Sequence, residues 1–399
     1  MKNDLSNTPQ PQGFATRAIH HGYNALDYHG AINPPLFLSS TFAFDKSATG
    51  TERFAGEAEG FIYHRVGNPT VDILEKRIAA LEGTEAALAT SSGMSAITTV
   101  FWTLLQAGDE IIADKTLYGC TFALLRHHIE KFQVSVRFVD LSTIDDLEAV
   151  ISAKTRIVFA ESPANPNMRI IDLASISALC KRHDATLVID NTYCTPYLQR
   201  PIEFGADIVV HSATKYLGGH GDLLAGLITG TQEMMNRLRF VGIKEMTGAA
   251  ISAFDAFLIL RGLKTLELRM DRHCTSAGRL AEELEAHSSV ARVDYPGLAS
   301  FAQRALAARQ MSQFGGMIAL ELKGGMEAGR RFMDALTLVT RAVSLGDAET
   351  LVQHPASMTH SNYSAEERVE HGFTDGLIRI SVGLETYEDI RDDLLTALG

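Results

Sequence analysis

Short apolar runs alternate with helix-length segments through the middle of the chain, and this alternation most constrains the fold. The apolar runs cover residues 85–89, 110–113, 134–139, 156–160, 186–189 and 206–210. Strands that alternate with helices pair in parallel, and helices then cover both faces of the sheet. We therefore predict an α/β fold with a mostly parallel sheet flanked by helices.

The sequence changes character on either side of this region. Residues 1–65 are irregular and rich in small residues, so we predict an arm there, and 66–262 then form the α/β domain. A long helical stretch at 265–287 leads into shorter apolar runs at 290–295, 316–322, 341–345 and 377–382. This second pattern predicts a smaller C-terminal α+β domain over 263–399.

Composition excludes several classes of protein. The net charge of −12 argues against non-specific nucleic-acid binding, which needs a basic surface. No apolar run reaches the roughly 18 residues of a membrane helix, and no secretory signal is visible, so we expect no membrane partner. The four cysteines are scattered without a CxxC pair, which is typical of free thiols in the cytoplasm.

The strongest chemical signal is a pair of strand ends. One apolar run ends at Asp190, and the next leads into Ser212, Thr214 and Lys215. Pyridoxal phosphate (PLP) enzymes need a lysine that bonds the cofactor aldehyde and an acid that keeps the ring nitrogen protonated. The two hydroxyls could bind the phosphate. Two ordinary buried strands ending in polar loops remain an equally good reading of these segments alone.

Three further segments could contact such a cofactor. The Gly/Ser-rich turn 90–96, with Gly93 and Met94, precedes a helical pattern and could hold an anion. Tyr118 follows a strand and could stack on a flat ring. Tyr63 and Arg65 lie two residues apart in the arm, and both suit a phosphate, which could belong to a neighbouring subunit. The alternatives are an ordinary Gly/Ser-rich turn between a strand and a helix, an amphipathic loop residue at Tyr118, which is the more common case, and a packed Tyr63 beside a solvated Arg65.

These residues together resemble the Cys/Met-metabolism family of PLP enzymes, and the likeness runs from about Phe14 to the C-terminus. The markers are Tyr63-His64-Arg65-Val66-Gly67-Asn68-Pro69-Thr70, Ser92-Gly93-Met94, Tyr118-Gly119, Asp190-Asn191-Thr192, Ser212-Ala213-Thr214-Lys215-Tyr216, Ser344-Leu345-Gly346 and Arg379-Ile380-Ser381-Val382-Gly383. The resemblance implies the aspartate-aminotransferase-like fold type I of PLP-dependent transferases. It also implies a homotetramer built from two tight dimers.

The resemblance assigns a role to each residue. Lys215 is expected to carry PLP and move protons, Asp190 to pair with the ring nitrogen, and Tyr118 to stack on the ring and activate the leaving group. The expected phosphate contacts are Gly93, Met94, Ser212 and Thr214 from one subunit and Tyr63 and Arg65 from its neighbour. The substrate carboxylate is expected to bind Arg379, with help from Ser344.

Residues that differ from the general family pattern indicate which substrate the protein cleaves. Cys120 stands where most relatives carry a second glycine, and Val343 stands where relatives that cleave cystathionine usually carry a glutamate. An apolar Val343 suits the methyl thioether of methionine better than the distal ammonium of cystathionine. The segment 242–248 is also similar to that of methionine-cleaving members, although Glu245 replaces the usual Asp. His64 is a further departure, since a small or hydroxyl residue is more common there.

We therefore expect α,γ-elimination of methionine to methanethiol, 2-oxobutanoate and ammonia. Cleavage of cystathionine, or sulfhydrylation of an O-acyl-homoserine, is the alternative. A PLP-binding regulator without turnover is a third reading, which is opposed by the complete set of catalytic residue types. Cys120 is expected to tune substrate recognition and proton transfer rather than to act as a nucleophile. No metal is expected.

Overall fold

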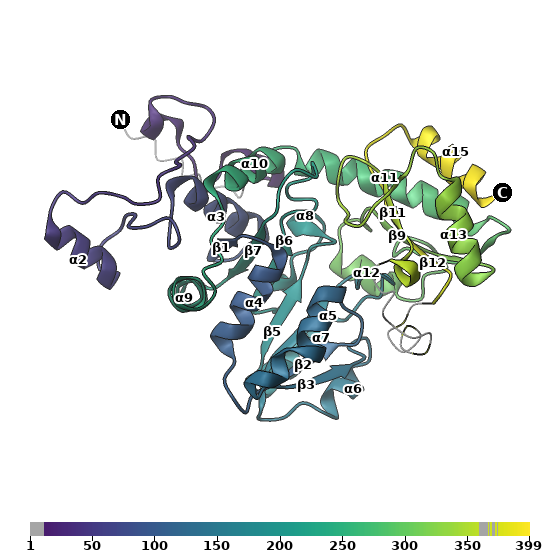
Figure 1. Cartoon of the computed structure of the whole chain (residues 1–399), viewed down its shortest axis with the longest axis horizontal. Coiled ribbons are helices and arrows are strands. Elements are labelled where there is room, and N and C mark those ends of the chain that lie inside the picture. Colours follow the sequence, from purple (N-terminus) through teal and green to yellow (C-terminus); the bar gives the residue numbers. More distant parts are fainter. Residues whose placement is uncertain (1–11, 359–365, 367, 369–371, 373) are drawn as a thin grey trace.

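A seven-stranded sheet forms the middle of the molecule. The computed structural model describes residues 12–358, 366, 368, 372 and 374–399. The strand order is β1-β7-β6-β5-β4-β2-β3. The strands are β1 (Ala86–Thr90), β2 (Glu110–Asp114), β3 (Ser135–Val139), β4 (Thr155–Glu161), β5 (Thr186–Asp190), β6 (Ile208–Ser212) and β7 (Gly226–Gly230). Helices lie on both sides of this sheet (Figure 1).

The strand directions confirm the predicted mostly parallel sheet, with one exception. Strands β3, β2, β4, β5 and β6 pair in parallel with their neighbours. Strand β7 is antiparallel to both β6 and β1. Strand β7 was not predicted, because its five residues begin and end with glycine, which is a weak strand signal.

Alternate side chains of the central strands enter two different cores. On β4, Ile157 and Phe159 pack with helices α4 (Gly93–Leu104) and α5 (Gly119–His127). Val158 and Ala160 pack on the other face with α7 (Leu173–Arg182). Both faces are therefore buried, which explains why these strands read as continuous apolar runs rather than as an alternating pattern.

The remaining helices frame these layers. They are α1 (Phe14–His20), α2 (Ser47–Ala55), α3 (Pro69–Glu82), α6 (Ile144–Glu148), α8 (Thr195–Leu198), α9 (Gln232–Arg237), α10 (Ala253–Leu263), α11 (Leu266–Glu285), α12 (Arg304–Gln310), α13 (Gly325–Ala335) and α15 (Tyr387–Leu398). A π-helix, η5 (Leu238–Thr247), continues α9 and packs on α4. The long helix α11 agrees with the predicted stretch 265–287.

A second sheet lies in the C-terminal part, in the order β10-β11-β12-β9-β8. Its strands are β8 (Val290–Asp294), β9 (Met317–Leu322), β10 (Thr340–Arg341), β11 (Leu351–Gln353) and β12 (Leu377–Ser381). The expected strand 341–345 is much shorter, because Ser344 has a φ of 97°, which an extended strand cannot adopt. The three-residue strand β11 was not predicted.

The N-terminal arm reaches away from the body of the molecule. Figure 1 shows α2 and the chain around it standing clear of the large sheet. By contrast, α1 packs against α3, where Arg17 Nη1 donates to the carbonyl of Ala80 at 2.5 Å. Among the described residues, no helix is both long and apolar enough to span a bilayer.

Candidate active site

The carboxyl ends of β4, β5 and β6 bring the predicted chemistry together. Asp190 ends β5 and Ser212 ends β6, and Lys215 follows three residues later. Glu161 ends β4 and is in register with Asp190. Ligands of doubly wound sheets bind at this edge, because loops from neighbouring strands converge there.

The amine of Lys215 is held in a largely buried position. Its Nζ donates to Ser344 Oγ at 2.5 Å. Burial lowers the pKa of Lys215 to about 8, and the positive charge of Arg379 adds to this shift while Asp347 opposes it. A lysine with such a pKa has far more neutral amine near neutral pH than an ordinary lysine has, although the ammonium still predominates. It can therefore act as a nucleophile and as a base.

Asp190 presents a buried carboxyl group to the same space. Its Oδ1 accepts hydrogen bonds from the backbone N–H of Thr192 at 3.0 Å and from Thr192 Oγ1 at 2.5 Å. Burial raises the pKa of Asp190, while the bonds from Thr192 and the charge of His211 act in the opposite direction. A cationic N–H placed next to this carboxylate would compensate its burial, as the protonated ring nitrogen of PLP would.

The start of α4 forms a cradle with the end of β6. A Cβ on Gly93 would lie 2.8 Å from Ser212 Cβ, so glycine is needed for this close approach. The first N–H groups of a helix have no acceptor within the helix and can bind an anion. Met94 is partly buried, and its sulfur accepts a hydrogen bond from Thr121 Oγ1 at 3.7 Å. This cradle fits the phosphate of PLP.

The hydroxyl of Thr214 already contacts the backbone of the protein. Its Oγ1 accepts the backbone N–H of Ala225 at 3.1 Å and lies 3.4 Å from the Ala225 carbonyl. Ser212 is bound through its backbone, whose N–H donates to Thr192 Oγ1 at 2.8 Å. Thr214 thus ties the Lys215 turn to the start of β7, and its expected phosphate contact stays a prediction.

Arg379 reaches the Lys215 side of the site from the C-terminal part. Its Nη2 donates to the carbonyl of Ser344 at 2.6 Å. Its Nη1 donates to Asn165 Oδ1 at 3.0 Å and to Tyr193 Oη at 3.4 Å. Arg379 Nε is buried without a partner in the described part of the chain. A guanidinium with a free donor next to Lys215 suits a substrate carboxylate.

Tyr118 directly precedes α5 and contacts Glu161 of this group. Its backbone N–H donates to Glu161 Oε1 at 2.7 Å, and its side chain is 44% exposed. Burial of the hydroxyl and its hydrogen bond with Cys120 raise the pKa of Tyr118, while Arg379 lowers it. The Cys120 thiol is exposed. Both side chains can therefore meet a ligand that enters from solvent.

Val343, Tyr63 and Arg65 stand apart from this cluster. Val343 precedes Ser344 and is 55% exposed. Tyr63 and Arg65 are exposed on the arm, with the Arg65 guanidinium 5.5 Å from the centre of the Tyr63 ring. Among the described residues, no hydrogen bond or ion pair joins these two to Lys215 or Asp190. Their expected action on a neighbouring subunit is untested.

Four residues of this site received no role from the sequence, although Thr192 lies in one of the family markers. Glu161 accepts the N–H of Tyr118, and burial together with repulsion from Asp190 raises its pKa well above the usual range. The others, Asn165, Thr192 and Tyr193, support Arg379 or Asp190 as described above. Glu161 ends a predicted strand at the same edge as Asp190, so its position could have singled it out. Asn165 lies in an irregular loop and gives no such signal.

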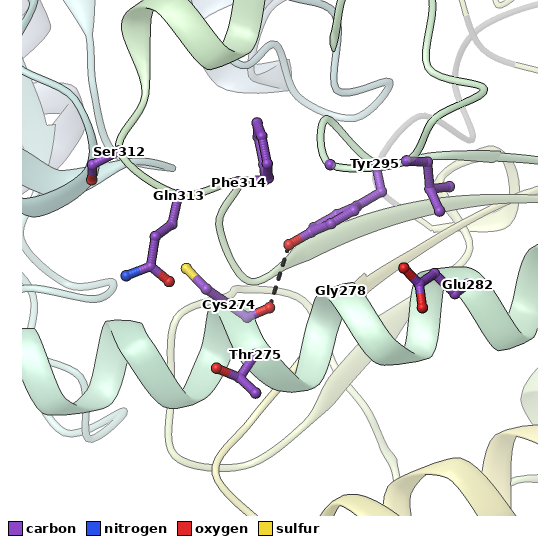
Figure 2. A pocket seen from close by; sticks show the side chains of 10 residues that line it. Cys274, Thr275, Gly278, Glu282, Tyr295, Ser312, Gln313 and Phe314 are labelled. Atoms are coloured by element: carbon purple, nitrogen blue, oxygen red, sulfur yellow. Dashed lines mark hydrogen bonds between the residues drawn. The ribbon is translucent and has the colours of Figure 1, made fainter.

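A separate cavity of about 330 Å³ lies beside α11 (Figure 2). Its lining contains none of the predicted site residues. Tyr295 Oη points to the carbonyls of Gly315 at 3.1 Å and Cys274 at 3.4 Å. Gln313 Nε2 donates to Asp271 at 2.6 Å. These lining groups are therefore satisfied within the protein, and no metal-binding cluster of three or more ligands occurs in the described parts of the chain.

Comparison with known proteins agrees with this geometry. The model of the Cys/Met metabolism PLP-dependent enzyme family matches residues 15–399. An L-methionine gamma-lyase from Pseudomonas putida is 57% identical, over 97% of both chains. An O-succinylhomoserine sulfhydrylase from Pseudomonas aeruginosa is 40% identical, over 96% of this chain and 95% of the relative.

A solved structure has the same fold. The crystal structure of metB from Corynebacterium glutamicum superposes with a TM-score of 0.91 and 41% identity, covering 98% of this chain and 99% of the other. The predicted fold type I is thereby confirmed. The chain therefore belongs to the Cys/Met metabolism PLP-dependent enzymes, and PLP is its cofactor.

Proposed function

We propose that the protein cleaves L-methionine by α,γ-elimination. Methionine and one water molecule give methanethiol, 2-oxobutanoate and ammonia. The observation that carries the proposal is the Lys215 amine hydrogen-bonded to Ser344, whose carbonyl in turn holds the carboxylate-binding group Arg379. This arrangement brings a base next to the α-carbon of a bound amino acid.

The substrate is suggested by the relatives. Six L-methionine gamma-lyases are 50% to 58% identical to this chain over 96% or 97% of its length. A cystathionine beta-lyase from Lactococcus lactis is 42% identical and the sulfhydrylase is 40% identical. The higher sequence identity to the methionine lyases favours methionine cleavage over the two alternative activities.

The cofactor would be held by residues that already lie close together at this edge of the sheet. PLP, when bound, supplies a ring that withdraws electrons from the substrate carbon being deprotonated. Gly93, Met94, Ser212 and Thr214 would hold its phosphate. Asp190 would keep a proton on its ring nitrogen, since a buried carboxylate is stabilised by a cationic partner.

Lys215 moves the protons on one side of the substrate. Its lowered pKa allows the neutral amine to accept the α-proton, and the ammonium then formed lies next to Ser344 Oγ. Arg379 orients the substrate through its carboxylate. Because Arg379 Nε is buried without a partner, the carboxylate would also satisfy this donor.

Tyr118 acts on the other side, where the sulfur leaves. Its hydroxyl is protonated at neutral pH, as a phenol with an ordinary or raised pKa is, so it can donate that proton to the departing methanethiolate. Cys120 adjoins this hydroxyl and can tune both the proton transfer and the fit of the thioether. Val343 presents an apolar side chain rather than a carboxylate to the distal end of the substrate.

Assembly would complete the site. Several large apolar side chains of the arm are exposed, including Leu26 at 74%, Ile32 at 85% and Leu38 at 74%. Exposed apolar surface of this kind is typical of subunit interfaces. We propose a homotetramer of two dimers in which Tyr63 and Arg65 bind the phosphate in the neighbouring subunit. The four free cysteines suit the cytoplasmic location expected from the sequence.

One assay tests the proposed activity. The purified protein is incubated with PLP and L-methionine, with cystathionine, and with an O-acyl-homoserine plus sulfide, and kcat/KM is measured for each. Methionine should have the highest kcat/KM and should release methanethiol and 2-oxobutanoate in equal amounts. Preferred turnover of either other substrate would replace the proposal by that activity. Absence of turnover with a fully bound cofactor would favour a PLP-binding regulator.

A further inference from the structure

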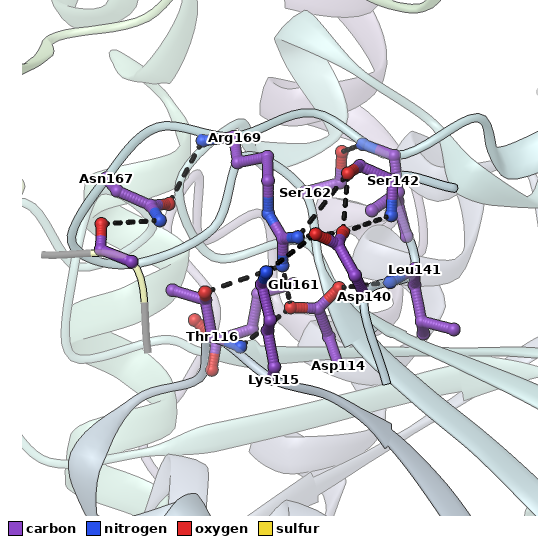
Figure 3. Close-up of polar contacts among 12 residues, drawn as sticks. Asp114, Lys115, Thr116, Asp140, Leu141, Ser142, Glu161, Ser162, Asn167 and Arg169 are labelled. Atoms are coloured by element: carbon purple, nitrogen blue, oxygen red, sulfur yellow. Dashed lines mark hydrogen bonds and ion pairs between the residues drawn. The ribbon is translucent and has the colours of Figure 1, made fainter. Parts of the chain in front are cut away.

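An ion cluster joins the loops that follow three neighbouring strands. Asp114 ends β2, Asp140 directly follows β3, and Arg169 lies in the loop after β4. These strands are adjacent in the sheet, in the order β4-β2-β3. Figure 3 shows Arg169 between the two carboxylates, with Lys115 beside Asp140. We call these four side chains the strand-end cluster.

The cluster is tightly bonded and mostly buried. Arg169 Nη2 donates to Asp114 Oδ1, and Nη1 donates to Asp140 Oδ1. Lys115 Nζ lies 2.7 Å from Asp140 Oδ2. The side chain of Asp114 is 0% exposed and that of Arg169 is 14% exposed. Removing Arg169 would leave the buried carboxylate of Asp114 without its cationic partner, so Arg169 constrains the loops strongly.

Asp114 connects the cluster to Tyr118. Its Oδ1 also accepts the backbone N–H of Thr116 at 2.7 Å, which fixes the turn after β2. Tyr118 follows two residues later, and its own N–H is held by Glu161 at 2.7 Å. The short segment that carries the Tyr118 ring is therefore fixed at both ends by buried carboxylates.

Arg169 connects the cluster to Asn165 through its backbone. The carbonyl of Arg169 accepts the N–H of Ala164 at 2.8 Å, and Met168 N–H donates back to the Ala164 carbonyl at 2.9 Å. Asn165 lies inside the loop that these bonds close. Its Oδ1 accepts Nη1 of Arg379 at 3.0 Å. Displacing Arg169 would therefore loosen a support of Arg379 as well.

We propose that Arg169 is a positioning residue that fixes the Tyr118 turn and the Asn165 loop through the strand-end cluster. The inference rests on the proposed function, in which Tyr118 protonates the leaving group and Arg379 binds the substrate carboxylate. Small displacements of reacting groups lower turnover strongly, because catalysis depends on their orientation. Arg169 itself acts only through Tyr118 and Asn165.

Arg169→Met tests the proposal against a more exposed ion pair on the same strands. We expect it to lower kcat for methionine about ten- to a hundredfold and to raise KM, while cofactor-bound protein is still obtained. The control is Arg137→Met. Arg137 Nε pairs with Glu110 Oε2 at 2.6 Å and so links β3 to the first residue of β2, at the end of the strands away from the cluster. The control should change both constants by less than about twofold.

A double-mutant cycle separates positioning from general damage. If Arg169 acts through Tyr118, Arg169→Met should lower kcat much less in a Tyr118→Phe background than in the wild type. The visible circular dichroism of bound PLP should change in Arg169→Met and stay unchanged in Arg137→Met, since it reports the surroundings of the ring. Arg169→Lys, which keeps the charge, should recover part of the loss. If Arg169→Met does not fold, Asp140→Asn takes its place in the same cycle.

The outcomes distinguish this inference from the proposed function. A wild type that releases no methanethiol overturns the proposed function, whatever the variants do. With an active wild type, additive losses in the double mutant overturn the positioning role. So does an equal loss in the Arg137→Met control, or unchanged dichroism in Arg169→Met.

Discussion

The charged residues around Lys215 have opposite effects on its pKa. Their balance sets the reactivity of its amine. Burial and the guanidinium of Arg379 lower its pKa to about 8, whereas Asp347 raises it. Ser344 Oγ holds the amine by a hydrogen bond of 2.5 Å. The reactivity of this lysine therefore depends on residues more than a hundred positions away in the chain.

A first prediction concerns this pKa in the apoenzyme. Competitive labelling of amines across a pH series should give Lys215 a midpoint near pH 8, with more neutral amine above it. Arg379→Leu removes a positive charge, so the midpoint should move to higher pH. Asp347→Asn removes a negative charge and should move it to lower pH. Shifts of the same sign in both variants would contradict this electrostatic account.

A second prediction concerns Val343. The side chain is 55% exposed next to Ser344, so a longer residue can be accommodated. Val343→Glu should lower kcat/KM for methionine and raise it for cystathionine, because a carboxylate can pair with the distal ammonium. The ratio of the two constants should change by about ten- to a hundredfold. An unchanged ratio would place specificity elsewhere, near Cys120 and the segment 242–248.

At the scale of elements, the start of α4 shows how a helix and a strand make a binding site together. Ser92 caps the helix in a capping box with Ser95, which fixes the direction of the first turn. The close approach of Gly93 to Ser212 then joins this turn to the end of β6. The Gly/Ser-rich segment thus has a structural reason for its composition beside the cofactor-binding role that we propose.

A third prediction follows from this approach. Gly93→Ala would place a Cβ 2.8 Å from Ser212 Cβ and 3.1 Å from Ser212 Cα, so backbone must shift at the cradle. Overpacking of this kind costs about 1–3 kcal/mol, and we expect the dissociation constant for PLP to rise roughly ten- to a hundredfold. Titration of the apoenzyme measures it. Gly278→Ala in α11 is the control, since its Cβ would make only an ordinary 3.7 Å contact with Tyr295 Oη.

At the scale of the whole molecule, the exposed arm points to a partner. His64 anchors the arm to the body through a 2.6 Å hydrogen bond between its Nε2 and the Ile251 carbonyl, while Tyr63 and Arg65 on either side stay exposed. The bond thus holds these two side chains on the surface of their own subunit. Such an arrangement suits residues that complete a site in another subunit.

A fourth prediction tests this exchange. Arg65→Ala and Lys215→Ala protomers should each be nearly inactive, yet mixed dimers contain one site with both residues intact. Random mixing should restore roughly a quarter of the wild-type activity, because half of the dimers are hybrids with one working site of two. Mass spectrometry verifies that the hybrids form. Verified hybrids without recovered activity would show that Arg65 acts within its own subunit.

The sequence was sufficient to predict a strand or a candidate site residue wherever the signal lay within one short segment. The parallel strands β2 to β6 were predicted because strands buried on both faces give continuous apolar runs. Asp190, Ser212 and Lys215 could be recognised because each lies at or just after the end of such a run. Strand β7 was missed, since a short run bounded by glycines resembles a loop, and the turn at Ser344 ended a predicted strand early.

The sequence by itself determined where strands β1 to β6 lie along the chain and which residue types carry the proposed chemistry, because apolar periodicity and side-chain chemistry are properties of short segments. Only the tertiary structure decided which groups meet. The contacts of Glu161 with Tyr118, of Asn165 with Arg379 and of Arg169 with Asp114 join separate loops at one edge of the sheet. These contacts depend on strand order and burial, which bring together residues that no local pattern connects.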